Sequence, residues 1–159
     1  MEKEKSKYRE RYKLLNKKLR ESEWQRIKIE LLSNGYKEIK KNGKLTTYYI
    51  NTSGEIRNKW GREIGKGQKT LDGYCHVTLS LKDEKWCPYI HQLVWLTFVG
   101  EIPKGYEIDH INTNRSDNRL ENLRCVDKPT NRKNPKSVLH YKESNKNKGI
   151  VRQRRELLI

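Results

Sequence analysis

The chain has 159 residues, of which 36 are lysine or arginine and 20 are aspartate or glutamate, so its formal net charge is +16. Only 33% of the residues are hydrophobic while 35% are charged, which excludes a large core and requires a small one concentrated in part of the chain. The charged N-terminus lacks a signal-peptide h-region and no apolar run is long enough to span a membrane, so we expect a cytoplasmic protein whose charge favours nucleic acid as partner.

The first predicted element is a basic helical arm over residues 1–35. Apolar residues recur at helical spacing from Tyr8 to Leu19. Ser22 is placed to cap a second helix after a short break, and the turn at Gly35 would end it. The arm is either a contact for a nucleic-acid backbone or a solvated helix, and both interpretations stay open.

Residues 36–84 are predicted to form a small antiparallel β region. A hairpin turn at Asn42-Gly43 leads into β-forming residues that end at Ile50, and a second turn ends at Gly54. The segment Tyr74–Leu81 alternates with period two, as a half-buried strand does. An alternative is a plain hairpin that packs on the core without any binding role.

The densest apolar run is Tyr89–Val99, which we expect to be a short buried helix ended by Gly100. A strand is the alternative that periodicity leaves open. After Asp127 the chain turns basic, with ten Lys and Arg against two Glu, which predicts a helix followed by a basic C-terminal tail over residues 139–159. The three cysteines form no C-x-x-C pair, so we expect neither a disulfide framework nor a structural zinc site.

The combination that carries chemistry lies between Gly105 and Asn131. Asp109 directly precedes His110, a polar loop follows, and Asn122 opens a second predicted strand. A histidine with an ordinary pKa near ~6.5 can take a proton from water at neutral pH. Carboxylate and amide oxygens suit Mg²⁺ or Mn²⁺. Because neighbouring strand residues point to opposite faces, a bend at the strand end is needed for both side chains to reach one phosphate.

With the upstream segment Ile90–Val94, this pattern resembles the HNH nucleases, and specifically the phage- and intron-encoded HNH homing endonucleases. The resemblance covers about residues 89–134. It implies a ββα-metal finger inside a nuclease domain over residues 85–138, with a strand that ends at His110, a strand at Leu123–Val126 and a helix that begins near Pro129. The implied class is α+β, in which a small antiparallel sheet region precedes the finger, with a helical basic N-terminal arm and a C-terminal tail.

The resemblance also implies the role of each site residue. His110 would be the catalytic base, Asp109 and Asn131 would hold the Mg²⁺ or Mn²⁺ ion, and Asn122 would be the structural asparagine that braces the loop. His91 is expected to orient its helix rather than to take part in catalysis.

A segment at Tyr48–Asn58 resembles a module that precedes such domains, which implies that the β region lies on DNA. The predicted DNA contacts are Arg57, Lys59, Arg62, Lys66, Lys69, Arg115, Arg119, Arg132 and Lys133. Basic side chains at these positions would follow the phosphates of the duplex.

The predicted function is therefore a metal-dependent DNA endonuclease of homing type that hydrolyses phosphodiester bonds at a recognised site in double-stranded DNA and nicks one strand per finger. We expect a monomer with no obligatory protein partner and no membrane association, in a bacterial or phage-infected cell. Two alternatives remain open. One is a non-catalytic DNA-binding or regulatory protein that keeps the finger as a scaffold, and the other is a nonspecific or restriction-type HNH nuclease.

Overall fold

The computed structural model describes residues 2–65 and 67–132, so the predicted C-terminal tail lies outside the described residues. The elements follow in this order: α1 (Glu2–Ser33), β1 (Lys37–Lys41), β2 (Lys44–Ile50), β3 (Ile56–Asn58), β4 (Gln68–Lys69), β5 (Cys75–His76), β6 (Leu79–Ser80), β7 (Lys85–Trp86), α2 (Ile90–Phe98), β8 (Tyr106–His110), the 3₁₀ helix η1 (Leu120–Asn122), β9 (Leu123–Asp127) and α3 (Lys128–Arg132). This mixture of helices and small antiparallel sheets confirms the predicted α+β class.

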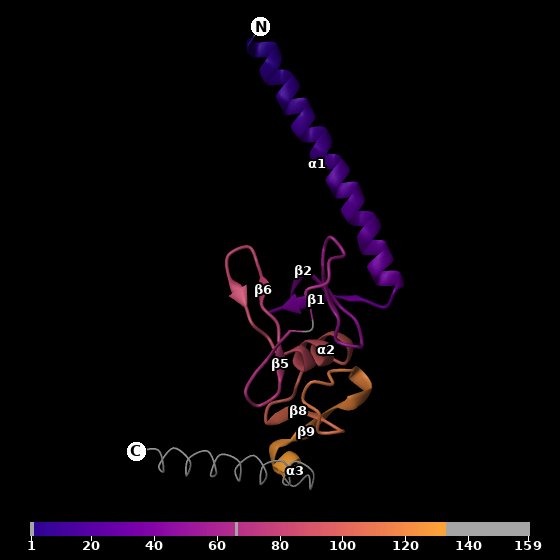
Figure 1. Cartoon of the computed structure of the whole chain (residues 1–159), viewed down its shortest axis with the longest axis vertical. Coiled ribbons are helices and arrows are strands. Elements are labelled where there is room, and N and C mark those ends of the chain that lie inside the picture. The colour runs from indigo at the N-terminus through magenta and orange to yellow at the C-terminus, as the bar shows by residue number, and fades with distance from the viewer. Residues whose placement is uncertain (1, 66, 133–159) are drawn as a thin grey trace, which may run out of the picture.

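Helix α1 is a 32-residue rod that projects from one end of the remaining elements, which we call the body (Figure 1). The helix runs unbroken through Ser22, so the predicted break is wrong. The Ser22 hydroxyl donates to the carbonyl of Leu19, 2.8 Å away, inside the helix and caps nothing. The C-terminal part of the rod is anchored because Leu31 packs with Tyr36 and Tyr49 in a small apolar cluster.

The three-stranded sheet β1-β2-β3 follows the turns that the sequence predicts. Asn42 and Gly43 both have positive φ, 50° and 75°, as a two-residue hairpin turn requires. In the turn between β2 and β3, the Asn51 carboxamide oxygen accepts the backbone N–H groups of Ser53 and Glu55. These local contacts fix the register of the sheet.

The single strand predicted over Tyr74–Leu81 is instead two short strands in separate two-stranded sheets. The alternation correctly placed Cys75, Val77 and Leu79 in the core. The backbone changes partner at Val77, whose N–H donates to the carbonyl of Pro88 at 3.1 Å. The side chains of this segment therefore alternate between buried and exposed, but its backbone does not pair with one neighbouring strand throughout.

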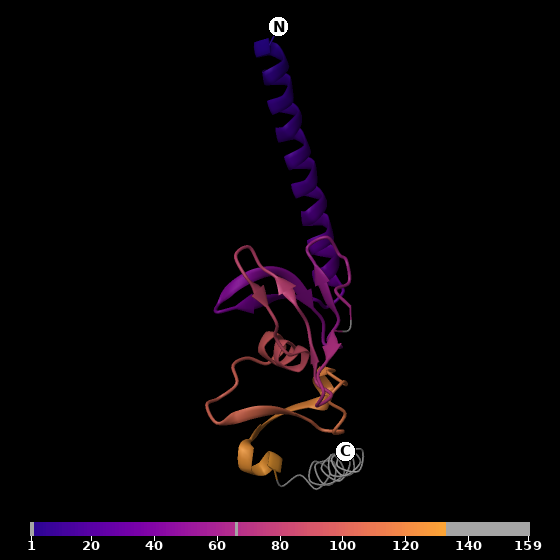
Figure 2. The ribbon, with the colours of Figure 1, turned by 60° about the vertical axis from the view of Figure 1, so that its left-hand side comes forward.

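Helix α2 lies between the three-stranded sheet and the β8–β9 hairpin, as both views show (Figure 2). Its buried face joins the two layers in one core. The fully or largely buried members of this core are Ile39, Ile50, Ile56, Cys75, Val77, Leu79, Ile90, Leu93, Val94, Ile108 and Leu123. The prediction of a short buried helix in the apolar run is confirmed. Within the part of the chain that the structure describes, no helix combines the length and apolarity needed to cross a bilayer.

Candidate active site

The elements β8, η1, β9 and α3 form a ββα unit, which we call the finger, at the end of the body opposite α1 (Figure 1). The antiparallel register pairs Asp109 with Arg124 and His110 with Leu123. Pro129 lies in the first turn of α3, where its missing N–H costs nothing, and the Asp127 carboxylate accepts the N–H of Thr130. The strand, strand, helix order is the one that the sequence predicts.

Asp109 and His110 leave β8 on opposite faces, because successive strand side chains alternate. The Asp109 carboxylate accepts two hydrogen bonds from Arg124, at 2.9 Å from Nε and 2.7 Å from Nη2. Both bonds go to Oδ2, and no donor among the described residues contacts Oδ1. The chain turns directly after His110, where the N–H of Ile111 donates to the carbonyl of Asn122 at 2.8 Å. Arg124 therefore holds one oxygen of Asp109 and leaves the other available for a ligand.

The His110 imidazole is buried, with 2% of its surface exposed. Burial is the largest influence on the pKa of His110 and lowers it, against smaller opposing effects of Asn118 and Asp109. The Nε2 atom lies 3.2 Å from the carboxamide oxygen of Asn118, whose amide nitrogen donates to the carbonyl of Ser116. This orientation of Asn118 assigns the imidazole proton to Nε2, so Nδ1 is the basic nitrogen of a ring that is neutral at pH 7.

A second buried histidine, His91 of α2, packs against His110 with 5.1 Å between ring centroids. Its ring also contacts Tyr74 and Tyr89. Burial, with a smaller effect of His110, lowers the pKa of His91 to about 4. The sequence separates these four rings by up to 36 positions, so their assembly could not be predicted from it.

Asn122 holds the loop between β8 and β9. Its carboxamide oxygen accepts the N–H of Asn112 at 3.0 Å, and its nitrogen donates to the Asn112 side chain at 3.0 Å and to the carbonyl of Asp117 at 2.8 Å. The side chain is buried, so each of these bonds replaces contacts that water would otherwise supply. This geometry matches the bracing role that the resemblance implies.

Asn131 lies on α3, where its amide nitrogen donates to the carboxylate of Glu107. Its carboxamide oxygen is buried and has no hydrogen-bond partner among the described residues. An unsatisfied buried oxygen is costly unless a ligand contacts it. Glu107 and Asp109 lie on the same face of β8, two residues apart. Glu107 is not among the site residues predicted from the sequence, although its position two residues before Asp109 was a usable signal.

The free oxygens of Asp109 and Asn131 are of the kind that a hard divalent cation prefers. No group of three or more His, Cys, Asp or Glu residues is placed to hold a metal ion within residues 2–65 and 67–132. A site built on this pair would rely on one carboxylate and one amide, with water and phosphate oxygens for the remaining positions. The unpartnered Asn131 oxygen is the observation that makes the pair fit such an ion.

An open hollow of about 240 Å³ adjoins Asn131. Its lining residues are Asp72, Tyr74, Tyr89, His91, Gln92, Glu107, Ile108 and Asn131. The hollow thus brings Asn131 of α3 next to the aromatic and histidine cluster that buries His110.

Three of the arginines predicted to contact DNA interact with the protein itself. Arg57 donates to the hydroxyl of Tyr36 and to the carbonyl of Gly61, both at 2.9 Å. Arg119 forms ion pairs with Asp117 and with a second carboxylate, and Arg115 donates to the carbonyl of Asp72. These contacts order the body and the loop of the finger.

The other predicted contacts are distributed differently. Arg62 and Lys69 are exposed, and Lys59 lies beside two indole rings. Arg132 belongs to α3, whereas Lys66 and Lys133 lie outside the described residues.

Comparison with known proteins shows what the finger is similar to. Residues 88–133 match the family model described as HNH endonuclease. The chain is 41% identical over 63 residues to the uncharacterized gene 5.3 protein of Enterobacteria phage T3, and 45% identical over 61 residues to protein 3.8 of Escherichia phage T7. These matches cover 38% and 36% of this chain, and 62% and 50% of the relatives, so it spans less than two thirds of either relative.

A solved structure is also similar. The HNH homing endonuclease I-HmuI, whose structure describes DNA binding and cleavage by that enzyme, is 28% identical with a TM-score of 0.56. The similarity covers 65% of this chain and 58% of that one.

Proposed function

We propose that the chain is a divalent-metal-dependent DNA endonuclease of homing type that nicks one strand of duplex DNA at a recognised site. The match of residues 88–133 to the HNH endonuclease family model and the similarity to a solved HNH homing endonuclease support this proposal. The observation that carries the proposal is the pairing, in one ββα unit, of a buried neutral imidazole with a buried amide oxygen that has no partner among the described residues. A purely structural finger has no need for either.

In the proposed reaction, Nδ1 of His110 accepts a proton from a water molecule as the water oxygen attacks phosphorus. The bond from phosphorus to the 3′ oxygen breaks and the leaving oxygen takes a proton from solvent water, which gives a 5′-phosphate and a 3′-hydroxyl. Asn118 holds the imidazole through Nε2 so that Nδ1 faces the water. Asp109 and Asn131 would hold the cation, which when bound stabilises negative charge on the leaving oxygen.

The test is nicking of supercoiled plasmid DNA in Mg²⁺ or Mn²⁺ by the wild type and by His110→Ala. Because general-base catalysis contributes roughly 10²- to 10⁴-fold, the variant should cleave slower by that factor while its affinity for DNA stays close to that of the wild type. His76→Ala is the matched control, because His76 is a half-buried histidine of β5 outside the finger. It should cleave at the rate of the wild type.

The type of nuclease is tested with a genomic DNA library whose cleaved ends are sequenced. Homing-type recognition predicts ends at one site or a small set of related sites. Ends distributed throughout the library would show a nonspecific nuclease instead. A wild type that binds DNA but leaves all substrates intact in both metals would show that the finger serves as a scaffold for binding.

A further inference from the structure

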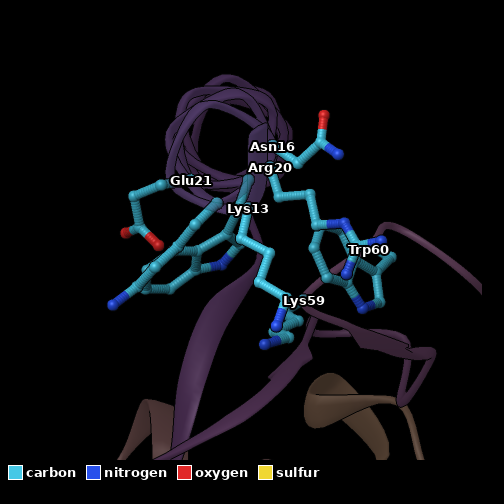
Figure 3. Close-up of a pocket in the computed structure, with 8 residues that line it drawn as sticks. Lys13, Asn16, Arg20, Glu21, Lys59 and Trp60 are labelled. Atoms are coloured by element: carbon cyan, nitrogen blue, oxygen red, sulfur yellow. The ribbon is translucent and has the colours of Figure 1, made fainter. Parts of the chain in front are cut away.

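An open hollow of about 420 Å³ lies between α1 and the residues that follow β3, far from the finger (Figure 3). Its lining residues are Lys13, Asn16, Lys17, Arg20, Glu21, Trp24, Lys59 and Trp60, and we call it the α1–Trp60 groove. The proposed reaction uses none of these residues.

The helical side of the groove is strongly basic. Lys13, Lys17, Arg20 and Trp24 follow one another at spacings of four, three and four residues, which places them on one face of α1. Farther along the helix, the same side of α1 carries Leu31, which anchors the helix to the body. The part of α1 that precedes Leu31 therefore turns its basic face toward Lys59 and Trp60 of the body.

The positive charges of the groove are not neutralised by the protein. Lys13, Lys17, Arg20 and Lys59 make no ion pair with any carboxylate among the described residues. The single acidic lining residue, Glu21, accepts a hydrogen bond from Gln25 one turn along the helix. Four cations around one hollow repel one another, so the groove stabilises an anion that enters it.

The other side of the groove is aromatic. The Lys59 ammonium lies 6.0 Å from the ring centroid of Trp24 and 5.0 Å from that of Trp60, which holds it between two indoles. Trp60 keeps 41% of its surface exposed, and Arg20 extends toward it in Figure 3. Aromatic surface among cations suits a ligand that alternates apolar and anionic groups, as a chain of sugars and phosphates does.

We propose that the α1–Trp60 groove binds the sugar–phosphate backbone of duplex DNA that flanks the cleavage site. This inference rests on the proposed function, because it takes the same substrate. Lys13, Lys17, Arg20 and Lys59 contact phosphates, and the indole of Trp60 packs against deoxyribose. Since the groove and the finger lie at opposite ends of the body, the contact falls on DNA away from the cut (Figure 1).

A second copy of α1 is a poor occupant of the groove. Residues 11–20 contain five basic side chains and no acidic one, so two such helices repel each other at close range. A polyanion has the complementary charge.

The test compares two triple variants of the full chain that lose the same charge from the same helix. Lys13→Gln/Lys17→Gln/Arg20→Gln empties the groove of its helical cations, and Arg11→Gln/Lys18→Gln/Arg26→Gln is the matched control on exposed positions outside it. Glutamine retains helix propensity, and circular dichroism checks that α1 is intact. Affinity for a labelled DNA duplex is measured in EDTA as a function of salt.

Each phosphate contact contributes about 0.9 to the slope of log affinity against log salt. The groove variant should therefore lose about 2 to 3 from the slope, while the control variant loses less than about 1. The proposal would be overturned if the two variants lost the same amount of slope, or if the groove variant lost none. The second result would indicate an acidic protein as the occupant of the groove.

The two proposals fail separately in this design. If the wild type nicks plasmid but both variants bind with equal slopes, the groove proposal is wrong and the nuclease proposal stands. If the wild type leaves plasmid intact but the groove variant alone loses slope, the groove binds DNA and the nuclease proposal is wrong.

Discussion

His91 packs against three rings, and a positive charge on its imidazole would be unfavourable in this buried position. Tyr74, Tyr89 and His110 face it, and none of them offers a negative charge to an imidazolium. Its Nδ1 atom is buried without a partner among the described residues. The folded protein therefore holds His91 neutral, with its pKa at about 4 instead of the ordinary 6.5.

This depressed pKa makes the stability of the protein depend on pH in a defined window. The unfolded chain protonates His91 as pH falls below about 6.5, whereas the folded chain resists until about pH 4, so stability falls across this interval by roughly 3 kcal/mol. Above pH 6.5 the contribution is constant. We predict that urea unfolding of the wild type loses this amount relative to His91→Phe, which keeps an aromatic ring but cannot titrate. An identical pH dependence in the two proteins would contradict it.

At the scale of single residues, the sequence was sufficient to place the candidate site residues in one unit, but it did not predict the partners of their side chains. The spacing of Asp109, His110, Asn122 and Asn131 was sufficient to place them in one finger, because strand pairing and the start of α3 are local. The contact of Asn118 with Nε2 of His110 was not predictable, since Asn118 is one of several polar residues in the loop that follows His110. Which of those side chains faces the ring depends on the folded shape of the loop.

At the scale of elements, the connection between β3 and β4 contains two glycines, Gly65 and Gly67, that are required for different reasons. A Cβ on Gly67 would lie 2.5 Å from the carbonyl oxygen of His76 and 2.8 Å from Cδ1 of Ile90, whereas a Cβ on Gly65 would meet nothing within 4 Å. Both residues have positive φ, 76° and 87°. Gly67 therefore allows the chain to pass close to β5 and α2, and Gly65 only allows the turn.

We predict that Gly65→Ala costs about 1 to 2 kcal/mol, which is the penalty of the left-handed conformation alone. Gly67→Ala should cost at least about 2 kcal/mol more, because β5 and α2 must also move. Urea denaturation of the two variants under the same conditions measures the difference. Equal losses would show that the close approach at Gly67 is relieved without cost.

Elements were predictable from sequence where local contacts decide them. The Asn42-Gly43 hairpin is fixed by residues adjacent in the chain, and it was predicted correctly. The division of Tyr74–Leu81 depends on Pro88, which replaces a strand as the partner of Val77. Helix α1 is continuous because the Ser22 hydroxyl bonds to a carbonyl of its own helix and does not cap a new one. A serine at this position is compatible with either arrangement, so the sequence does not distinguish them.

At the scale of the whole molecule, the charge of +16 is distributed unevenly. Residues 101–127, which form most of the finger, contain six acidic and four basic residues, whereas the outer part of α1 is uniformly basic over residues 11–20. Among the described residues, the basic segment of α1 therefore lies at the end of the body opposite the site where a cation would be held (Figure 1). This separation would let α1 attract DNA without competing with the cation for Asp109.

The described residues contain one finger with one histidine that we propose as the catalytic base, and one such site can hydrolyse one strand in each encounter. We therefore predict that supercoiled plasmid is first converted to the open-circular form, and that linear DNA appears only later from a second, independent cut. The rate of nicking should rise in proportion to protein concentration, because every residue of the proposed site lies in one chain. Gel electrophoresis of a time course over a range of protein concentrations checks both points. Linear product formed without an open-circular intermediate, at a rate that rises with the square of protein concentration, would instead show two fingers acting together across the duplex.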